Sequence, residues 1–243
     1  MSRQRGFSLV ELIVVIVLLG IVAVSTTQFV SQGLSIYVDT ARRDNLQQQG
    51  RFAVERVSRE LRNALPGSVR VAGNCVDFMP VLNASSYLQS VVTGAAISSL
   101  DIIDVGYSFG SGDRLAVYPI DSDSVYGSAN AMANLTGASV SGNVQTLTFG
   151  SHQFVLESPT QRAFIAAPTV TFCATDGALT RNGVPIAEHI RIAENMVSFS
   201  AFAFTEGTLQ RAGIVHLDFR FQDLAEAGEW VRFNHEISVR NTP

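Results

Sequence analysis

The sequence predicts an α+β fold in which one long N-terminal helix packs on an antiparallel β-sheet head. The first observation is an apolar run at residues 6–24, GFSLVELIVVIVLLGIVAV, which continues into helical periodicity up to residue 65. The second is alternation of apolar and polar residues in several later segments, which is typical of half-buried strands. The 243 residues are 47% hydrophobic, enough for a sizeable core, and the net charge of -4 does not favour nucleic-acid binding.

The apolar run predicts a transmembrane segment at about residues 7–30. After Glu11 the next formal charge is Asp39. Arg3 and Arg5 precede the run without an acid, so the positive-inside rule places the N-terminus in the cytoplasm and the later chain across the membrane. In that oxidising compartment Cys75 and Cys173 are expected to form a disulfide rather than a metal site.

Three interpretations of the N-terminus differ in how they account for the carboxylate of Glu11. A signal peptide cleaved near residues 23–25 and a plain membrane anchor would each hold a carboxylate in lipid, at a cost of about 2.5–3.5 kcal/mol. Cleavage between Gly6 and Phe7 would instead create an α-amino group about one helical turn from Glu11. The attraction within such a buried pair barely offsets the free energy of desolvating its two charges. The pair therefore contributes more to the specificity of packing than to stability. Where copies of the helix pack together, the amine of one would meet the carboxylate of the next and fix their stagger.

These residues resemble the N-terminus of type IV prepilins and type II secretion pseudopilins, in which a basic leader, a glycine, an aromatic residue, an acid at a fixed offset and an aliphatic run coincide. The resemblance implies that residues 1–6 are a leader, that prepilin peptidase cuts between Gly6 and Phe7, and that Phe7 is N-methylated. It implies that Glu11 aligns subunits in a filament. Many major pilins have proline where this chain has Gln28, a departure that concerns how the helix unwinds in a filament.

The resemblance also implies a location and a set of partners. The protein would be stored as a single-pass protein of the bacterial inner membrane, in contact with lipid, with a cytoplasmic N-terminus and a periplasmic head. An inner-membrane assembly platform would then extract it into a pilus at the cell surface, together with other minor and major pilin subunits. The implied fold is pilin-like, and the implied role is structural, without enzyme activity or a cofactor.

Residues 38–65 predict an amphipathic continuation of the helix. Apolar residues recur at three- and four-residue spacing, and they are Ala53, Val54, Val57, Leu61, Ala64 and Leu65. They are expected to pack on the protein's own head. Glu55 with Arg59 and Arg56 with Glu60 have the spacing of ion pairs on the solvent side. Pro66 and Gly67 are expected to end the helix.

Residues 66–243 are expected to form the β-rich head as one domain. The clearest strand candidates are IVHLDFRFQ (214–222), WVRFNHEISV (230–239) and MVSFSAFAF (196–204). Shorter candidates are CVDFM (75–79), RLAVYPI (114–120), VQTLTFG (144–150), HQFVLE (152–157) and TVTFCA (169–174). Asn182-Gly183 predicts a tight turn. Residues 83–143 are rich in Ser, Gly and Ala, and long loops with a few short strands are expected there.

The head also suggests a subclass. The segment RFAVERVSRELRNA, the large β head and the ending HEISVRN resemble J-type pseudopilins and W-type minor pilins. ESPTQRAFIAAPTVTFCATDGALTR (157–181) is similar to the O-type minor prepilins of mannose-sensitive haemagglutinin (MSHA) pili. A minor subunit of pilus initiation or of the pilus tip is therefore the leading hypothesis, with a minor pseudopilin of type II secretion or a tip binding module formed by the loops of residues 83–143 as alternatives.

Two motifs and the four histidines are candidate chemical sites, and a structural interpretation is preferred for each. GYSFG (106–110) has the spacing of a nucleophile elbow around Ser108, but the following residues predict a turn and a strand where the elbow needs a helix. DSDSVYG (121–127) lacks the third acid and the distal glutamate of a calcium loop, so a solvated turn is expected. His152, His189, His216 and His235 stand in no metal-binding motif.

Overall fold

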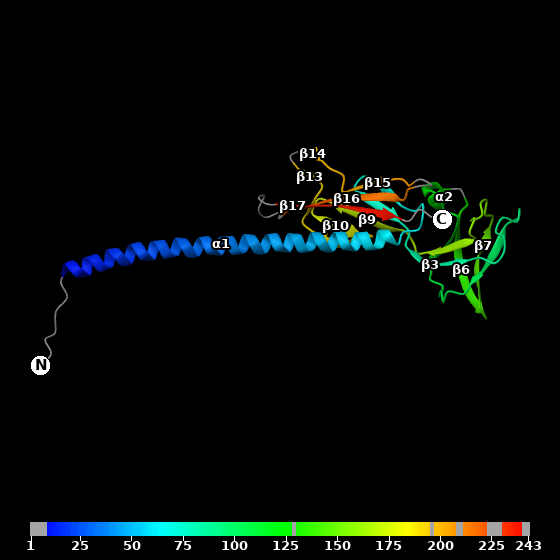
Figure 1. Cartoon of the computed structure of the whole chain (residues 1–243), viewed down its shortest axis with the longest axis horizontal. Helices are drawn as coiled ribbons and strands as arrows, with labels where there is room; N and C mark the ends of the chain where they lie inside the picture. Colours follow the sequence, from blue (N-terminus) through cyan, green and yellow to red (C-terminus); the bar gives the residue numbers. More distant parts are fainter. Residues whose placement is uncertain (1–8, 128–129, 195–196, 208–210, 223–229, 240–243) are drawn as a thin grey trace. The chain divides into compact units, whose positions relative to one another are not determined.

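The computed structural model of the chain describes residues 9–127, 130–194, 197–207, 211–222 and 230–239 (Figure 1). It confirms the predicted α+β fold, a long N-terminal apolar helix followed by antiparallel sheets. The chain divides into two units, Met1–Asn45 and Leu46–Pro243. Helix α1 (Leu9–Arg62) forms the described part of the first unit and continues as the first element of the second.

Helix α1 runs for 54 residues because no proline interrupts the sequence before Pro66. It ends at Arg62, three residues before the predicted end. The N–H groups of Asn63 and Ala64 donate to carbonyl oxygens three residues back, both at 3.1 Å, which tightens the last turn. Ala64 then forms a β-bridge with Pro80, which takes the chain out of the helical path.

Two antiparallel sheets of the second unit lie against the C-terminal part of α1. The five-stranded sheet has the order β1-β2-β9-β10-β11, formed by Arg70–Ala72, Cys75–Phe78, Val170–Thr175, Ala178–Arg181 and Val184–Glu188. In the four-stranded sheet, β16 pairs with β12, β15 and β17, and these strands are Gly213–Gln222, Ile190–Arg191, Phe202–Thr205 and Trp230–Val239. A hairpin of β13 (Ala193–Glu194) and β14 (Val197–Ser198) accompanies them.

The main core lies between α1 and these two sheets. The helix contributes the predicted stripe, in which Ala53, Val57 and Leu61 are fully buried. Opposite it, every second residue of β16 is fully buried, and these are Val215, Leu217, Phe219 and Phe221. The buried side chains of the helix, which recur about once per turn, and those of the strand, which recur at every second residue, therefore form one apolar layer.

An ion-paired cluster ties the helix to the five-stranded sheet. Glu60 accepts from Arg56 at 2.7 Å, one helical turn away, and from Arg181 of β10 at 2.9 Å. The predicted Arg56–Glu60 pair is thus present, but Glu60 is turned toward the sheet and only 16% of its side chain is exposed. The second predicted pair is wrong, since among the described residues Glu55 and Arg59 form no ion pair.

The chain leaves the five-stranded sheet after β2 and returns to it at β9, and the residues between form a six-stranded lobe (green in Figure 1). Its strand order is β3-β8-β5-β6-β7-β4, formed by Val81–Ser86, Arg162–Ala166, Arg114–Val117, Met132–Ser141, Val144–His152 and Ile97–Ile103. The two edges meet, because Tyr87 bridges Ile102 and the Leu88 N–H donates to the Asp101 carbonyl at 2.9 Å. The lobe is therefore a barrel whose two edges join at this point, and it has its own core.

The expectation of long loops with a few short strands over residues 83–143 is confirmed in part, since residues 88–96 and 104–113 lie outside the strands. That segment holds β3 in part, β4, β5, the short helix α2 (Ser122–Tyr126) and the ten-residue strand β6. Gly142 has a φ of +62° and, with Asn143, makes the two-residue connection between β6 and β7. The small residues of β6 were wrongly interpreted as loop because their strand character comes from pairing with β5 and β7.

The strand predictions outside this segment are mostly confirmed. IVHLDFRFQ and WVRFNHEISV form β16 and β17 in full register, and Asn182 and Gly183, both with positive φ, turn β10 into β11. MVSFSAFAF is divided between β14 and β15, where the Ala201 N–H donates to the Asn74 side chain. HQFVLE is not a strand after His152, since Phe154 turns inward against Phe149.

The cysteines predicted to form a disulfide are bridged. Cys75 of β2 and Cys173 of β9 are direct partners in the sheet, with Cα atoms 4.1 Å apart. The two residues are 98 positions apart and enclose the whole barrel between them. The bridge therefore fixes the point where the barrel is inserted into the sheet, and it restricts the unfolded chain as the closure of a long loop does.

Gly50 permits the closest approach between α1 and β17. A Cβ atom at this position would overlap the ring of Phe233. Glycine is unfavourable in a helix interior by about 1 kcal/mol relative to alanine, so its presence here follows from packing and not from helix propensity.

We expect Gly50→Ala to destabilise the second unit by about 1–3 kcal/mol, because the overpacking cost exceeds the gain in helix propensity. Urea unfolding of the full chain in detergent measures this. Gly33→Ala is the matched control, since nothing lies within 4 Å of the site of its Cβ. Phe233→Leu combined with Gly50→Ala should recover part of the loss. Equal stability of Gly50→Ala and the parent would contradict the packing argument.

Candidate membrane and assembly segment

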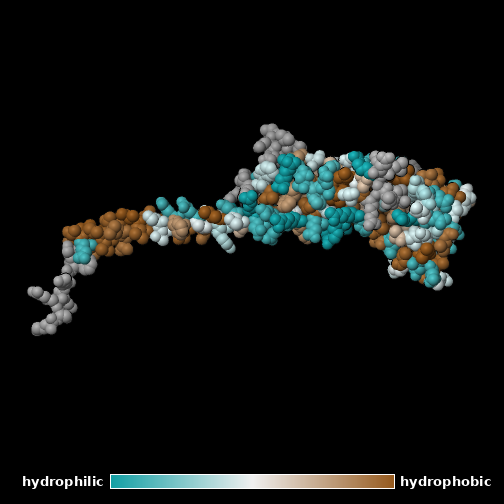
Figure 2. All heavy atoms as spheres, viewed as in Figure 1, coloured by the Kyte–Doolittle hydropathy of each residue, from teal (hydrophilic) through white to brown (hydrophobic). Residues whose placement is uncertain are grey.

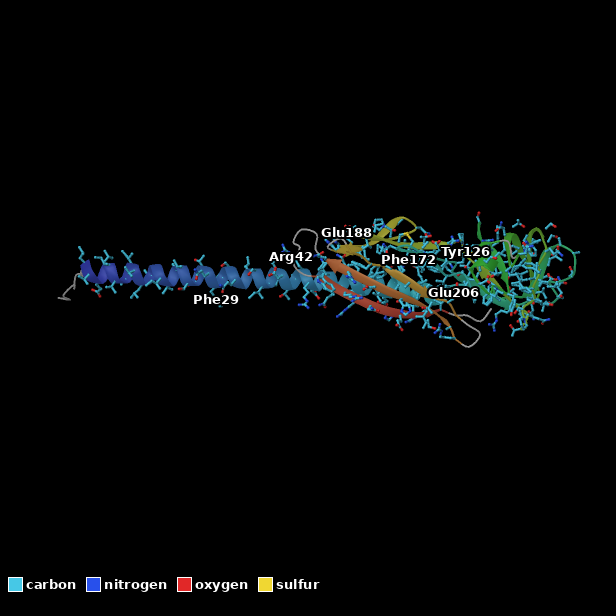
Figure 3. All side chains as sticks on the ribbon, turned by 90° about the horizontal axis from the view of Figure 1, so that it is seen from above. Phe29, Arg42, Tyr126, Phe172, Glu188 and Glu206 are labelled. Carbon is cyan, nitrogen blue, oxygen red and sulfur yellow. A yellow bond between two sulfur atoms is a disulfide. The ribbon has the colours of Figure 1, made fainter. Side chains whose placement is uncertain are left out.

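The N-terminal part of α1 presents apolar side chains that its own chain does not cover. Its best 18-residue window has a mean hydropathy of 2.8, none of it is buried, and the helix is long and apolar enough to cross a membrane. Leu9 is 74% exposed and Phe29 77%. Figure 2 shows this end of the helix as an apolar surface, and Figure 3 shows Phe29 projecting away from the helix axis. Such a surface needs lipid or other protein to cover it.

Hydroxyl side chains beyond the apolar run bond to the helix itself. Ser25, Thr26 and Thr27 donate to carbonyl oxygens four residues back, at 2.9, 2.7 and 2.8 Å. Ser31 and Ser35 do the same to carbonyls three residues back, each at 2.9 Å. These polar groups are thereby satisfied without a partner from water, so the helix remains compatible with an apolar environment up to this region.

Glu11 lies in the first turn of the described helix and is exposed. Within the described part of the chain its carboxylate has no ion pair or hydrogen bond. A negative charge is favourable near a helix N-terminus, but in an apolar environment it still requires a cation. Gly6 and Phe7, the predicted cleavage site and methylation site, lie outside the described residues. At Gln28, where many major pilins have proline, the helix continues without a break.

Ser108 does not stand on a nucleophile elbow. It lies in the loop between β4 and β5, and a strand follows where the elbow requires a helix. Both glycines of GYSFG have structural reasons. Gly106 has a φ of +68°, and a Cβ atom on Gly110 would lie 2.8 Å from the Asp113 carboxylate, to which the Gly110 N–H donates at 3.0 Å. The Tyr107 hydroxyl donates to the same carboxylate at 2.7 Å, so Asp113 holds the loop closed.

The segment DSDSVYG forms the short helix α2 in place of the expected solvated turn. Asp121 is its N-cap and accepts from the Ser124 N–H at 2.7 Å, while the Ser124 hydroxyl accepts from the Asp121 N–H. The first acid of the calcium-like pattern is therefore engaged in capping. Among the described residues, no group of three or more His, Cys, Asp and Glu side chains could hold a metal ion.

The histidines are dispersed over the second unit. His152 lies within hydrogen-bond distance of the Asn130 carbonyl, at 2.9 Å, and His216 of β16 lies 3.3 Å from Glu236 of β17. His189 has a φ of +62° at the junction of β11 and β12. His235 is half-buried on the helix-facing side of β17.

Sequence reasoning missed a groove between α1 and β17 within the second unit. Its open volume is about 660 Å³, and it is lined by Arg51, Val54, Glu55, Ser58, Arg59, Arg62, Phe233 and His235. The helical members recur at three- and four-residue spacing, next to the buried stripe. The sequence contains that spacing, but it does not show that an edge strand would lie beside it.

Residues 1–27 match the model of the prokaryotic N-terminal methylation motif. The chain carries a type IV prepilin-like N-terminus. The motif supports a pilin-like or pseudopilin-like structural subunit, and it implies processing by prepilin peptidase and assembly with other pilins. No curated protein and no solved structure matches the chain.

The hydrogen bond between Tyr107 and Asp113 is expected to make the stability of this prepilin-like protein depend on pH. Burial and the hydrogen bond to Asp113 raise the pKa of Tyr107 from its usual 10 to about 12. Because the folded pKa is the higher one, the stability that Tyr107 provides is complete below pH 10 and is lost as the pH rises toward 12.

We therefore expect the free energy of unfolding to fall between pH 10 and pH 12, and to fall less steeply in Tyr107→Phe. At pH 7 this variant should be less stable by about 1–3 kcal/mol, since Asp113 loses a donor. Urea unfolding at pH 7, 10 and 11.5 measures both effects, with Tyr118→Phe as the control. The same alkaline slope in Tyr107→Phe as in the parent would refute the assignment.

Proposed function

We propose that the protein is a minor pilin-like structural subunit of a type IV pilus of the MSHA type, acting in initiation of assembly or at the pilus tip. The observation that carries the proposal is the combination of the methylation motif with an unbroken helix whose apolar surface its own chain does not cover. A helix of this kind is suited first to storage in lipid and then to burial among the helices of other subunits.

In this proposal prepilin peptidase removes residues 1–6 in the cytoplasm, and the new amino group of Phe7 is methylated. Methylation leaves the amine positively charged. The four-residue step from Phe7 to Glu11 makes about one helical turn, roughly 6 Å along the axis. The amine of one subunit then pairs with Glu11 of its neighbour, which sets the axial stagger of the two helices. An inner-membrane assembly platform moves the subunit from lipid into the filament.

The size of the head supports a minor position. The barrel adds a second lobe with its own core to the part of the head that covers α1. A bulky head is difficult to repeat along a thin helical filament, but at a tip it needs neighbours on one side only. The head would be periplasmic before assembly and displayed at the cell surface afterwards.

Two alternatives remain compatible with the motif. A minor pseudopilin of a type II secretion system would be processed in the same way and would use Glu11 in the same role. A tip subunit that also binds a surface or a ligand would use the loops of residues 83–143, which the barrel carries. Loss of pili in a deletion strain, with protein secretion retained, favours the pilus over the secretion system.

Processing is tested by the intact mass and N-terminal sequence of the protein recovered from its native membrane. We expect a chain that begins at Phe7 and is heavier by one methyl group. The same protein from cells without prepilin peptidase is the control and should retain residues 1–6. A start near Thr26 would make the apolar run an ordinary signal peptide and would contradict the proposal.

Substitution of Glu11 tests the alignment role separately from processing. Glu11→Ala should still be cleaved, but it leaves an unpaired amine in an apolar environment at a cost of about 3–5 kcal/mol. Incorporation into pili should therefore fall more than a hundredfold, as counted by immunoelectron microscopy and immunoblots of sheared pili. Asp39→Ala, which removes the next acid along the helix, is the control. Normal incorporation of Glu11→Ala would exclude this role.

A further inference from the structure

We propose that the groove between α1 and β17 docks an acidic, extended segment of another protein, which adds to the free edge of β17 as one more strand. The groove is lined by the eight residues named above, six from the helix and two from the strand. All of them belong to the second unit, so the site is independent of the methylation motif and of the pilus role.

The edge of β17 is open to pairing. This strand pairs with β16 over ten residues, and in the described part of the chain it has no strand on its other side. Edge strands present a row of N–H and C=O groups that a further strand can bond, and peptide recognition by strand addition uses such edges.

Burial on the helix-facing side of the sheet decreases toward the N-terminal part of β17. On the helix-facing side of β16 every second residue is fully buried, from Val215 to Phe221. On the same side of β17, Val231, Phe233 and His235 are only partly covered, whereas Ile237 and Val239 are buried. The incomplete cover is thus confined to the part of β17 that borders the groove. Inward side chains of an added strand would fill it, because alternate residues of a strand point to the same face.

The helical wall of the groove is cationic. Arg51, Arg59 and Arg62 are exposed, and among the described residues they form no ion pair, while Glu55 is the single acid of the lining. Arg59 and Arg62 lie in the last turn of α1, where positive charge is favourable to the helix, so their presence alone does not indicate a ligand. Their position beside an apolar floor of Val54 and Phe233 favours a segment with carboxylates and apolar residues on one face.

Ser58 gives an independent indication of a missing partner. Its side chain lines the groove and is only 5% exposed, yet its hydroxyl oxygen has no hydrogen-bond partner among the described residues. Most serines in the N-terminal half of α1 bond a carbonyl of the preceding turn, as Ser25 and Ser31 do. A buried hydroxyl without a partner is unfavourable by about 1–3 kcal/mol. Because the oxygen itself is covered, a bound segment would have to turn the Ser58 side chain toward the groove to provide a partner and remove that penalty.

The charge of the groove also indicates whether its occupant is a different protein or a second copy of this chain. Pairing of two β17 edges would place two arginine-lined grooves next to each other, and like charges across an interface oppose association. An acidic segment avoids this repulsion and pairs with the arginines instead. We therefore assign the groove to a partner with glutamate or aspartate on the inward face of its strand.

The test uses the full-length protein in detergent and a fluorescent ten-residue peptide with threonine on one face and alternating glutamate and valine on the other. We expect saturable binding by fluorescence anisotropy, and no binding of the same peptide with lysine for every glutamate. The double variant Arg59→Glu, Arg62→Glu should weaken binding at least tenfold. Arg162→Glu, an exposed arginine of the barrel, is the matched control and should bind as the parent does.

Strand addition is distinguished from simple ion pairing by two further peptides, N-methylated at the odd or at the even backbone amides. Since alternate N–H groups of a strand point to opposite edges, only one of the two peptides should bind. Hydrogen exchange of β17 amides should slow with the acidic peptide.

Three results would overturn the proposal: equal binding of the lysine peptide, equal binding of both methylated peptides, or a stable dimer of this chain that the double variant dissociates. Circular dichroism shows whether the double variant is folded, and Ser58→Ala, a smaller change within the groove, should weaken binding severalfold in support.

Discussion

The packing of one helical stripe beneath two sheets is the interaction on which the second unit depends. Ala53, Val57 and Leu61 are small or branched residues without exposed surface, and they meet the fully buried face of β16. Gly50 lets the helix approach Phe233, and Glu60 joins the helix to Arg181 of β10. The barrel is attached to this arrangement through β2 and β9, and the disulfide secures the same pair of strands. The helix thus organises the main core, while the barrel retains a separate core of its own.

The sequence allowed prediction of elements whose periodicity is local. The stripe from Ala53 to Leu61, the alternation in β16 and β17, and the Asn182-Gly183 turn could be predicted because adjacent residues carry the whole pattern. The barrel was missed because β6 is built from small and polar residues whose conformation is imposed by neighbouring strands. The dipeptide Gly142-Asn143 was the local signal that would have revealed the hairpin, and a pattern search that weights such turns would have found it.

The candidate sites likewise differ in whether their residues are adjacent in the sequence or are brought together by the fold. The N-terminal motif is contiguous, so roles for Gly6, Phe7 and Glu11 could be predicted from the sequence alone, and the family match covers the same first 27 residues. The groove combines one face of the helix with Phe233 and His235 of β17, and only the fold brings these residues together. Likewise, the sequence offered a possible elbow at Ser108, whereas the structure shows that Asp113 and Tyr107 define that loop for structural reasons. Short motifs are therefore informative here only where the surrounding secondary structure agrees with them.

The two charged features of α1 operate under different physical conditions. Glu11 lies in an apolar stretch, where the low dielectric makes an unpaired charge costly and a matched pair strongly dependent on geometry. This suits a contact that must be made in one register. The groove arginines are exposed, where water and salt weaken each pair, so specificity there must come from several weak pairs combined with the hydrogen bonds of a strand. Under the two proposals, one helix would carry a contact of fixed register in its apolar part and a weaker, salt-sensitive contact beside the head.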